Sequence, residues 1–203
     1  RAEKTHARIG IGIWNADREL MASLHSAERF AELLVVGNVD ESCPYEHICT
    51  DEPWRELVGL LANGVIDGAV RGNLPAGRTM RALAEEFRLP VRRLALIELS
   101  GWAFLLGPVG IDEGETAQDR LDLLLGDSKL LQNMGVLPRA AVLSGGRRED
   151  RGRCERVDRS LLEGDQIAAR ALKAGIDAEH KGILIENCRE MTSSSLLMAS
   201  QAT

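Results

Sequence analysis

A short apolar run that stops at two glycines and two arginines most constrains how this chain can fold. After Arg139 the run is Ala-Ala-Val-Leu, and the segment Ser144–Arg148 follows it directly. In an open α/β sheet, a strand of this kind delivers a loop to the carboxyl edge of the sheet, where ligands bind. Residues 65–70 repeat the arrangement, since a second loop with glycine and arginine comes next. The sequence therefore predicts two strand ends that carry ligand loops.

Strand and helix patterns alternate along the chain. Apolar, β-branched runs predict strands at residues 8–14, 34–37, 65–70, 93–99, 102–109, 139–144 and 182–186. Apolar residues at helical spacing predict helices at residues 18–33, 51–62, 76–87, 117–135 and 154–174. This alternation predicts a three-layer α/β/α fold with a mostly parallel sheet covered on both faces. Residues 191–203 show neither pattern, and we expect a frayed end there.

The alternation is interrupted near residues 90–102. Pro90 and the pair Ser100-Gly101 lie between helical and apolar runs, a pattern that favours a hairpin or a crossover between lobes. We therefore expect two lobes, residues 1–92 and 93–203. Whether the second lobe is complete at its C-terminal side stays open. A cleft between the lobes would lie beside both glycine loops.

Composition excludes two classes of partner. The net charge is −6 and aromatic residues make up 3% of the chain, so neither the basic surface nor the stacking platforms of a nucleic-acid binder are expected. No run reaches the roughly 18 apolar residues that a membrane span needs. The cytoplasm is the expected location. Twenty-one arginines stand against four lysines, which indicates either codon bias or selection for bidentate contacts to oxyanions.

No metal centre or catalytic triad is predicted. Cys43, His47 and Cys49 lie close together, but their spacing fits no structural zinc motif. We favour a loop with incidental cysteines over a metal site, and the role of these residues stays open. The four histidines are scattered, and none is expected to pair with a serine and an acid in a triad.

The two loops supply the candidate ligand-binding residues. Gly72 can take a positive φ, and the side chains of Arg71, Asn73 and Arg78 could then hold one anionic group at a helix N-terminus. The second anionic group would be held by Ser144, Gly145, Gly146 and Arg147. The alternative for both segments is an ordinary loop with solvated arginines.

A dinucleotide site at Gly10-Ile-Gly12 is less favoured. The fingerprint needs a third glycine where Asn15 stands, so close packing of a strand explains these glycines better.

At these residues the chain resembles the phosphate acetyl/butyryltransferase superfamily. The segment Gly135-Val-Leu-Pro-Arg-Ala-Ala-Val-Leu-Ser144 is similar to that family's Gly-x-x-Pro-Arg-Val-Ala-Met-Leu-Ser segment. Asp67–Val70 with Thr79-Met-Arg81 resembles its strand followed by a helix with threonine and arginine. The likeness covers roughly residues 60–175, and within the superfamily it is strongest to the MtxX-like, methyltransferase-related proteins of methanogenic archaea.

The resemblance implies a phosphotransacetylase-like fold, a site role for Arg81, a phosphate or CoA-type ligand, and methyltransferase subunits as partners. Two features depart from the acyltransferases. Residues 1–203 hold no Ser-Arg-Gly segment followed by an aspartate, and Leu106-Gly-Pro-Val109 stands where the family has an acid. Three functions therefore stay open: a methyl- or acyl-transferring enzyme, a ligand-binding accessory subunit, and a purely structural partner. Association as a homodimer is also open.

Overall fold

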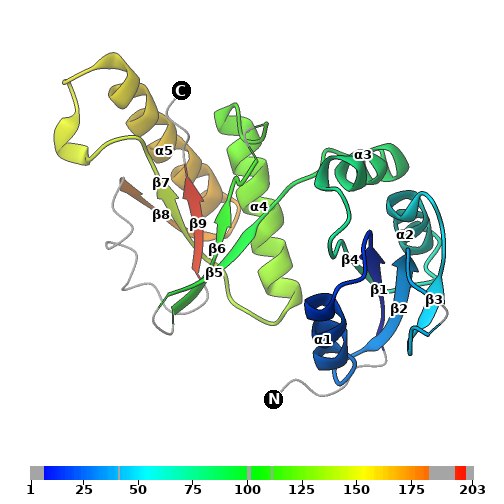
Figure 1. The fold of residues 1–203 in the computed structure, drawn as a ribbon. Coiled ribbons are helices and arrows are strands. Elements are labelled where there is room, and N and C mark those ends of the chain that lie inside the picture. The colour runs from blue at the N-terminus through cyan, green and yellow to red at the C-terminus, as the bar shows by residue number, and fades with distance from the viewer. Residues whose placement is uncertain (1–6, 41, 100–101, 111, 183–194, 200–203) are drawn as a thin grey trace. The chain divides into compact units, whose positions relative to one another are not determined.

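The computed structural model describes residues 7–40, 42–99, 102–110, 112–182 and 195–199. It divides the chain into two compact units, residues 1–91 and 92–203. Each unit has a β-sheet of its own, with helices packed against it (Figure 1). The two units are described separately below.

Unit 1 is a parallel four-stranded sheet with three helices. Its strands lie in the order β3-β2-β1-β4, and every pair is parallel. In chain order the elements are β1 (Arg8–Ile13), α1 (Arg18–Ala27), β2 (Glu32–Gly37), β3 (Glu46–Ile48), α2 (Pro53–Ala62), β4 (Gly68–Val70) and α3 (Ala76–Phe87). The predicted boundaries of α3 are confirmed.

The sheet of unit 1 is covered on both faces. Ile13 and Val35 face α1, where they pack with buried Leu24. Leu34 points to the opposite face and packs with Leu57 of α2. Alternate residues of one strand thus serve two cores, as expected for a parallel strand covered by helices on both sides. The predicted three-layer α/β/α arrangement is confirmed in this unit.

Glycines allow the backbones of unit 1 to approach closely. A Cβ atom on Gly12 would lie 2.8 Å from the carbonyl oxygen of Arg71, and one on Gly10 would overlap the side chain of Ile66. Gly72 has a φ of 57°, and a Cβ there would lie 2.1 Å from the carbonyl oxygen of Gly12. Close packing therefore accounts for the Gly10-x-Gly12 pair, as the sequence favoured.

Unit 2 has a five-stranded mixed sheet in the order β5-β6-β9-β7-β8. The predicted hairpin is confirmed, because β5 (Ala95–Leu99) and β6 (Trp102–Gly107) pair antiparallel, while every other pair is parallel. The remaining elements are α4 (Ala117–Asn133), β7 (Arg139–Leu143), the 3₁₀ turn η1 (Arg148–Asp150), α5 (Glu155–Lys173), β8 (Asp177–Gly182) and β9 (Ser195–Ala199).

In unit 2 the described helices share one face of the sheet. Leu124 of α4 and Ile167 of α5 pack together with Val142 of β7. The other face holds a smaller cluster around Phe104 and Leu143. Among the residues described in this unit, helical cover is thus one-sided, in contrast to unit 1.

Three predicted elements differ from the structure. Helix α1 ends at Ala27 rather than at residue 33, because Glu32 pairs with Arg8 at the start of the sheet and the chain must turn before it. Near the last predicted strand, residues 182–186, the structure has a strand that begins earlier, β8 (Asp177–Gly182); residues 183–186 lie outside the described part of the chain, and a strand there stays a prediction. The expected frayed end is wrong for residues 195–199, since β9 pairs with both β6 and β7.

Candidate functional site

The first predicted loop is fastened to its neighbouring strand. The backbone N–H of Trp14 donates to Asn73 Oδ1 over 2.7 Å, and Asn73 Nδ2 donates to the carbonyl oxygen of Asn15 over 2.6 Å. The Arg71 guanidinium donates to the carbonyl oxygen of Leu74. Asn73 therefore joins the ends of β1 and β4, and this contact explains it without a ligand.

Two arginines of α3 line a pocket with a tryptophan of α2. The pocket has a volume of about 340 Å³ and includes Trp54, Arg78 and Arg81 among its lining residues. The guanidinium carbon of Arg78 lies 4.6 Å from the centroid of the Trp54 ring. Because Trp54 and Arg78 lie in the first turns of α2 and α3, this pocket is close to the carboxyl edge of the parallel sheet, where α/β proteins bind ligands.

The charges around this pocket divide into a paired set and an unpaired set. Arg55 lies 3.5 Å from carboxylate oxygens of Glu52 and of Glu85. Arg78 and Arg81 form no ion pair with any carboxylate of the described residues. The structure thus brings Arg78 and Arg81 together, while Arg71 is held by the backbone of its own loop and Asn73 by the backbone that follows β1.

The second predicted loop directs its backbone donors to its own chain. The N–H of Ser144 donates to the carbonyl oxygen of Gly182 over 3.1 Å, and the N–H of Gly145 donates to Ser160 Oγ over 2.8 Å. The N–H of Arg147 donates to Asp150 Oδ2 over 3.0 Å. These amides form a fixed turn after β7 rather than a set of free donors for an anion.

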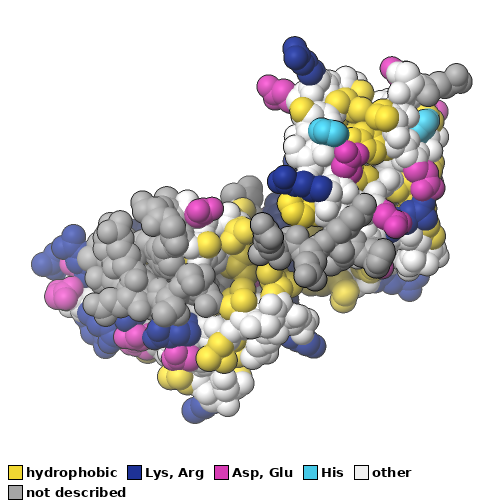
Figure 2. Space-filling model, turned by 90° about the horizontal axis from the view of Figure 1, so that it is seen from below, with side chains coloured by type: hydrophobic (Ala, Val, Ile, Leu, Met, Phe, Trp, Pro, Cys, Tyr) yellow, Lys and Arg dark blue, Asp and Glu magenta, His cyan; other side chains and the backbone are white. Residues whose placement is uncertain are grey.

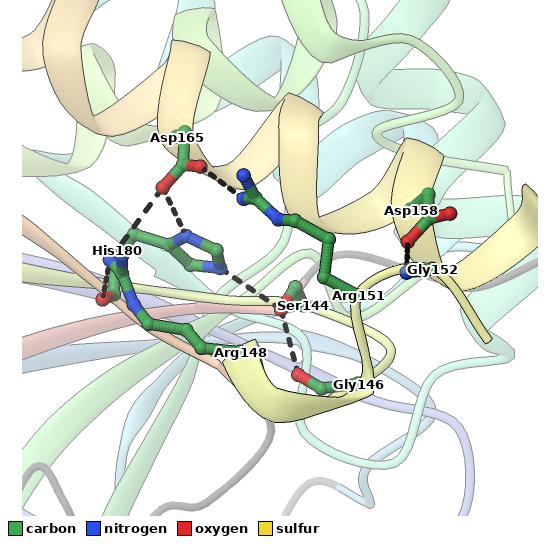
Figure 3. A network of polar contacts seen from close by, with 8 residues as sticks. All are labelled: Ser144, Gly146, Arg148, Arg151, Gly152, Asp158, Asp165 and His180. Atoms are coloured by element: carbon green, nitrogen blue, oxygen red, sulfur yellow. Dashed lines mark hydrogen bonds and ion pairs between the residues drawn. The ribbon is translucent and has the colours of Figure 1, made fainter. Parts of the chain in front are cut away.

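Ser144 belongs to a network that the sequence did not predict (Figure 3). Its Oγ lies 3.0 Å from His180 Nε2, and His180 Nδ1 lies 2.7 Å from Asp165 Oδ1. The expectation that no histidine pairs with a serine and an acid is therefore wrong. The three residues come from the end of β7, from the middle of α5 and from β8. Their distance along the chain hides an arrangement that only the tertiary structure creates.

Two arginines surround the acid of this network. Arg151 Nη2 donates to Asp165 Oδ2 over 3.0 Å, and Arg148 Nη2 lies 3.6 Å from Asp165 Oδ1. Burial by itself raises the pKa of the Asp165 carboxyl, but hydrogen bonds from His180 and Arg151 outweigh it, so the pKa lies below its ordinary value. Asp165 is consequently a carboxylate near neutral pH.

A glycine in helix α5 makes room for the imidazole. A Cβ on Gly164 would lie 2.6 Å from His180 Nε2. Glycine inside a helix costs up to about 1 kcal/mol relative to alanine, so its presence beside His180 has a steric reason. This glycine and the inward-facing His180 of β8 are the signals in the sequence that could have indicated the network.

A second buried acid lies in α4. Asp127 is 6% exposed, and its Oδ2 atom has no hydrogen-bond partner among the residues described. Burial raises the pKa of this carboxyl to about 7. Its Oδ2 would lie 3.6 Å from a Cβ built on Gly107. An acid from α4 thus comes close to the segment, residues 106–109, at which the sequence lacks one.

Other classes of site find no support in the described part of the chain. There, no group of three or more His, Cys, Asp or Glu side chains is placed to hold a metal ion. None of its helices is both long and apolar enough to cross a membrane. On the face drawn in Figure 2, basic and acidic side chains of the described residues are interspersed.

Comparison with known proteins identifies relatives over nearly the whole chain. No family model matches. A protein of Methanosarcina barkeri named "Putative methyltransferase mtx subunit X" is 36% identical over 195 residues, which cover 92% of this chain and 72% of the relative. A protein with the same name from Methanosarcina acetivorans is 38% identical over 195 residues, with 92% and 70% covered. The chain belongs to this mtx subunit X family.

Solved structures share the fold of this mtx subunit X family protein. A branched-chain phosphotransacylase of Enterococcus faecalis superposes with a TM-score of 0.65 at 13% identity, covering 94% of this chain and 79% of that one. The EutD phosphotransacetylase of Staphylococcus aureus gives 0.63 at 14% identity, covering 98% and 78%. The predicted phosphotransacetylase-like α/β fold is confirmed, and the likeness concerns the fold alone.

Proposed function

We propose that this protein is a methyltransferase-related transferase of the mtx subunit X family, and that its first unit binds a small anionic ligand in the pocket of Trp54, Arg78 and Arg81. The observation that supports it is the pair of guanidinium groups without carboxylate partners among the described residues. The names of the relatives support the transferase class.

The chemistry of the pocket favours a phosphate-like group. Arg78 and Arg81 lie three residues apart on α3, so they project from neighbouring positions on one helix face. Guanidinium groups bind phosphate and carboxylate oxygens through paired hydrogen bonds. The Trp54 ring braces Arg78 through a cation–π contact. A pocket of about 340 Å³ lies at the small end of ligand sites, which suits a phosphate with a short attached group or the end of a CoA-type molecule.

A non-catalytic accessory role is the second candidate. It is favoured by the word "subunit" in the names of several relatives. An accessory subunit would bind the anion without converting it and would associate with methyltransferase subunits. The predicted cleft between lobes and the predicted homodimer stay predictions.

A thermal-shift series tests the pocket. Phosphate, acetyl phosphate, CoA and S-adenosylmethionine are each added to the wild type, to Arg81→Ala and to Arg18→Ala, which removes an exposed arginine of α1 as a control. At a hundredfold excess over the dissociation constant, binding adds roughly 2.7 kcal/mol to the free energy of unfolding. We expect one of the anionic ligands to raise the melting temperature of the wild type and of Arg18→Ala but not of Arg81→Ala.

The same samples separate the two candidate functions. Conversion of the stabilising ligand by the wild type, lost in Arg81→Ala, assigns an enzyme. Stabilisation without conversion, even with the methyltransferase subunits present, assigns an accessory subunit. A well-folded wild type that responds to none of the four compounds contradicts the pocket.

A further inference from the structure

The pocket of unit 1 carries negative as well as positive side chains. Besides Arg78 and Arg81, its lining residues include three further charged side chains, Glu52, Arg55 and Glu85. Arg55 lies 3.5 Å from a carboxylate oxygen of each glutamate. Because two carboxylates face one guanidinium, this second group of charges keeps a net negative charge, for which a simple anion has no use.

Building on the anion pocket proposed above, we propose that the same pocket binds a phosphate ester that also carries an ammonium group. The phosphate lies on the two unpaired arginines of α3, and the ammonium lies beside Glu52 and Glu85. The net charges are complementary. Three arginines and two glutamates leave the pocket with one positive charge, and a phosphate dianion joined to one ammonium has one negative charge. Opposite charge favours association and selects among partners.

The direction of Glu85 keeps the two kinds of charge apart. Glu85 lies four residues after Arg81 on α3, a spacing at which acidic and basic side chains can pair. In the structure its carboxylate lies instead beside Arg55 of α2, and Arg81 has no carboxylate partner among the described residues. The Arg81 guanidinium is thus left for the phosphate of the ligand, although an acid stands one helical turn away.

The two glutamates can accept hydrogen bonds from a ligand. At 3.5 Å, the contacts with Arg55 are longer than a charge-assisted hydrogen bond. No group of the described residues donates a hydrogen bond to either carboxylate, whereas an ammonium has donors and no acceptor. The side chains of Glu52 and Glu85 are 61% and 53% exposed, so a ligand can reach them from solvent.

The spacing along α3 sets the length of the ligand. Arg81 and Glu85 are roughly 6 Å apart along the helix axis, because each residue of an α-helix adds about 1.5 Å. A linker of about two carbon atoms between the phosphate oxygen and the ammonium nitrogen spans a similar distance. The pocket volume of about 340 Å³ also suits a small molecule. O-phosphoethanolamine is a simple compound of this class and serves as the probe.

Calorimetric titration of the full chain with three matched phosphate esters tests the proposal. O-phosphoethanolamine carries the ammonium, propyl phosphate has a methyl group in its place, and phosphoglycolate has a carboxylate. We expect the wild type to bind O-phosphoethanolamine about 2- to 5-fold more tightly than propyl phosphate, as exposed ion pairs allow. Phosphoglycolate should bind more weakly than propyl phosphate. Added salt should reduce the preference for the ammonium, because it screens exposed charges.

Two neighbouring glutamates of α3 provide the variant and its control. In Glu85→Gln the affinities for O-phosphoethanolamine and propyl phosphate should become nearly equal. Propyl phosphate itself should bind at least as tightly as to the wild type, because Arg55 loses a carboxylate partner. Glu86→Gln changes an exposed acid outside the pocket lining and should keep the wild-type preference.

The outcomes distinguish the ligand class from the pocket itself. Equal affinity of the wild type for O-phosphoethanolamine and propyl phosphate, with both lost in Arg81→Ala, would overturn the ammonium preference and leave the anion pocket in place. A preference that persists unchanged in Glu85→Gln would also overturn it. A folded wild type that binds none of the three esters would contradict the anion pocket, and this ligand class with it.

Discussion

At the scale of single residues, Asp127 is the group whose ionisation costs stability. The pKa of its buried carboxyl is about 7 in the folded protein, against 3.8 as its ordinary value. Between these pH values the folded state holds a proton that the unfolded state has released. The free energy of unfolding should therefore fall as pH rises from about 4 to 7, by at most roughly 4 kcal/mol from this group.

Asp127→Asn removes this dependence without changing the shape of the side chain. We expect the variant to match the wild type near pH 4 and to be more stable at pH 8, as measured by urea denaturation at both values. Asp51→Asn, which changes an exposed carboxylate of unit 1, is the control and should show no such gain. An equal response of the two variants to pH would contradict the raised pKa of Asp127.

Gly164 lies beside His180 and makes a sharper steric prediction. Replacing a helical glycine by alanine normally stabilises a helix by up to about 1 kcal/mol. In Gly164→Ala the new methyl group would collide with the His180 imidazole, and we expect a loss of roughly 1–3 kcal/mol from overpacking. In the control Gly126→Ala of α4 the new Cβ would meet only the end of the Arg92 side chain at 3.5 Å, so thermal melts should show no loss.

At the scale of elements, the start of α4 is set by a reciprocal cap. The N–H of Asp119 donates to Thr116 Oγ1 over 3.1 Å, and the N–H of Thr116 donates to Asp119 Oδ2 over 2.9 Å. Thr116→Ala should lower the free energy of unfolding by about 1 kcal/mol, and Thr116→Ser should retain most of it. Chemical denaturation, followed by a signal from unit 2, measures the free energy of unfolding of both variants. A Thr116→Ala variant as stable as the wild type would mean that packing alone fixes this helix end.

The same cap explains why several elements could be predicted from the sequence. Local signals mark the ends of α2, α3 and α4: a proline in the first turn, a helix end before Leu89-Pro90, and Thr116 before an apolar run. Strands β8 and β9 lack such signals. In β8 the inward position is His180, a polar residue whose partners are far away in the sequence, so the alternation typical of a strand is hidden.

The candidate sites also differ in how far the sequence alone could predict them. Arg78 was predicted because strand, loop and helix follow one another in the chain, so local order places it at a sheet edge, whereas a role for Arg81 came from the family resemblance. The partnership of Ser144 with His180 was not predictable, since it depends on the parallel pairing of β7 with β8 across helix α5. The ligand-binding roles expected for Arg71 and Asn73 stay predictions, and backbone carbonyl oxygens compete with a ligand for the same donors.

At the scale of the whole molecule, each unit has a core of its own. The two clusters that hold buried residues of unit 1 contain only residues from 9 to 83, including Leu34 and Leu57. A fragment of residues 1–91 should therefore fold by itself, since it has the size and the separate core of a small domain. Circular dichroism and a cooperative thermal melt would confirm this, and a fragment without a melting transition would contradict it.

That fragment also carries two neighbouring tryptophans, Trp14 and Trp54, whose ring centroids lie 5.6 Å apart. Their fluorescence should report directly on an anion that reaches Arg78, because its guanidinium covers the Trp54 ring. Phosphate titration of the fragment and of the whole chain should give similar signals if the pocket of unit 1 is sufficient for binding.

The position of β9 has a consequence for how the protein is made. Residues 195–199 form an inner strand, and β6 and β7 are joined only through it. A ribosome therefore releases every residue of unit 1, and most of unit 2, before this sheet can close. Until then, the facing edges of β6 and β7 present unpaired N–H and C=O groups, which invite pairing with other chains. Newly synthesised unit 2 should thus depend on chaperones for longer than unit 1.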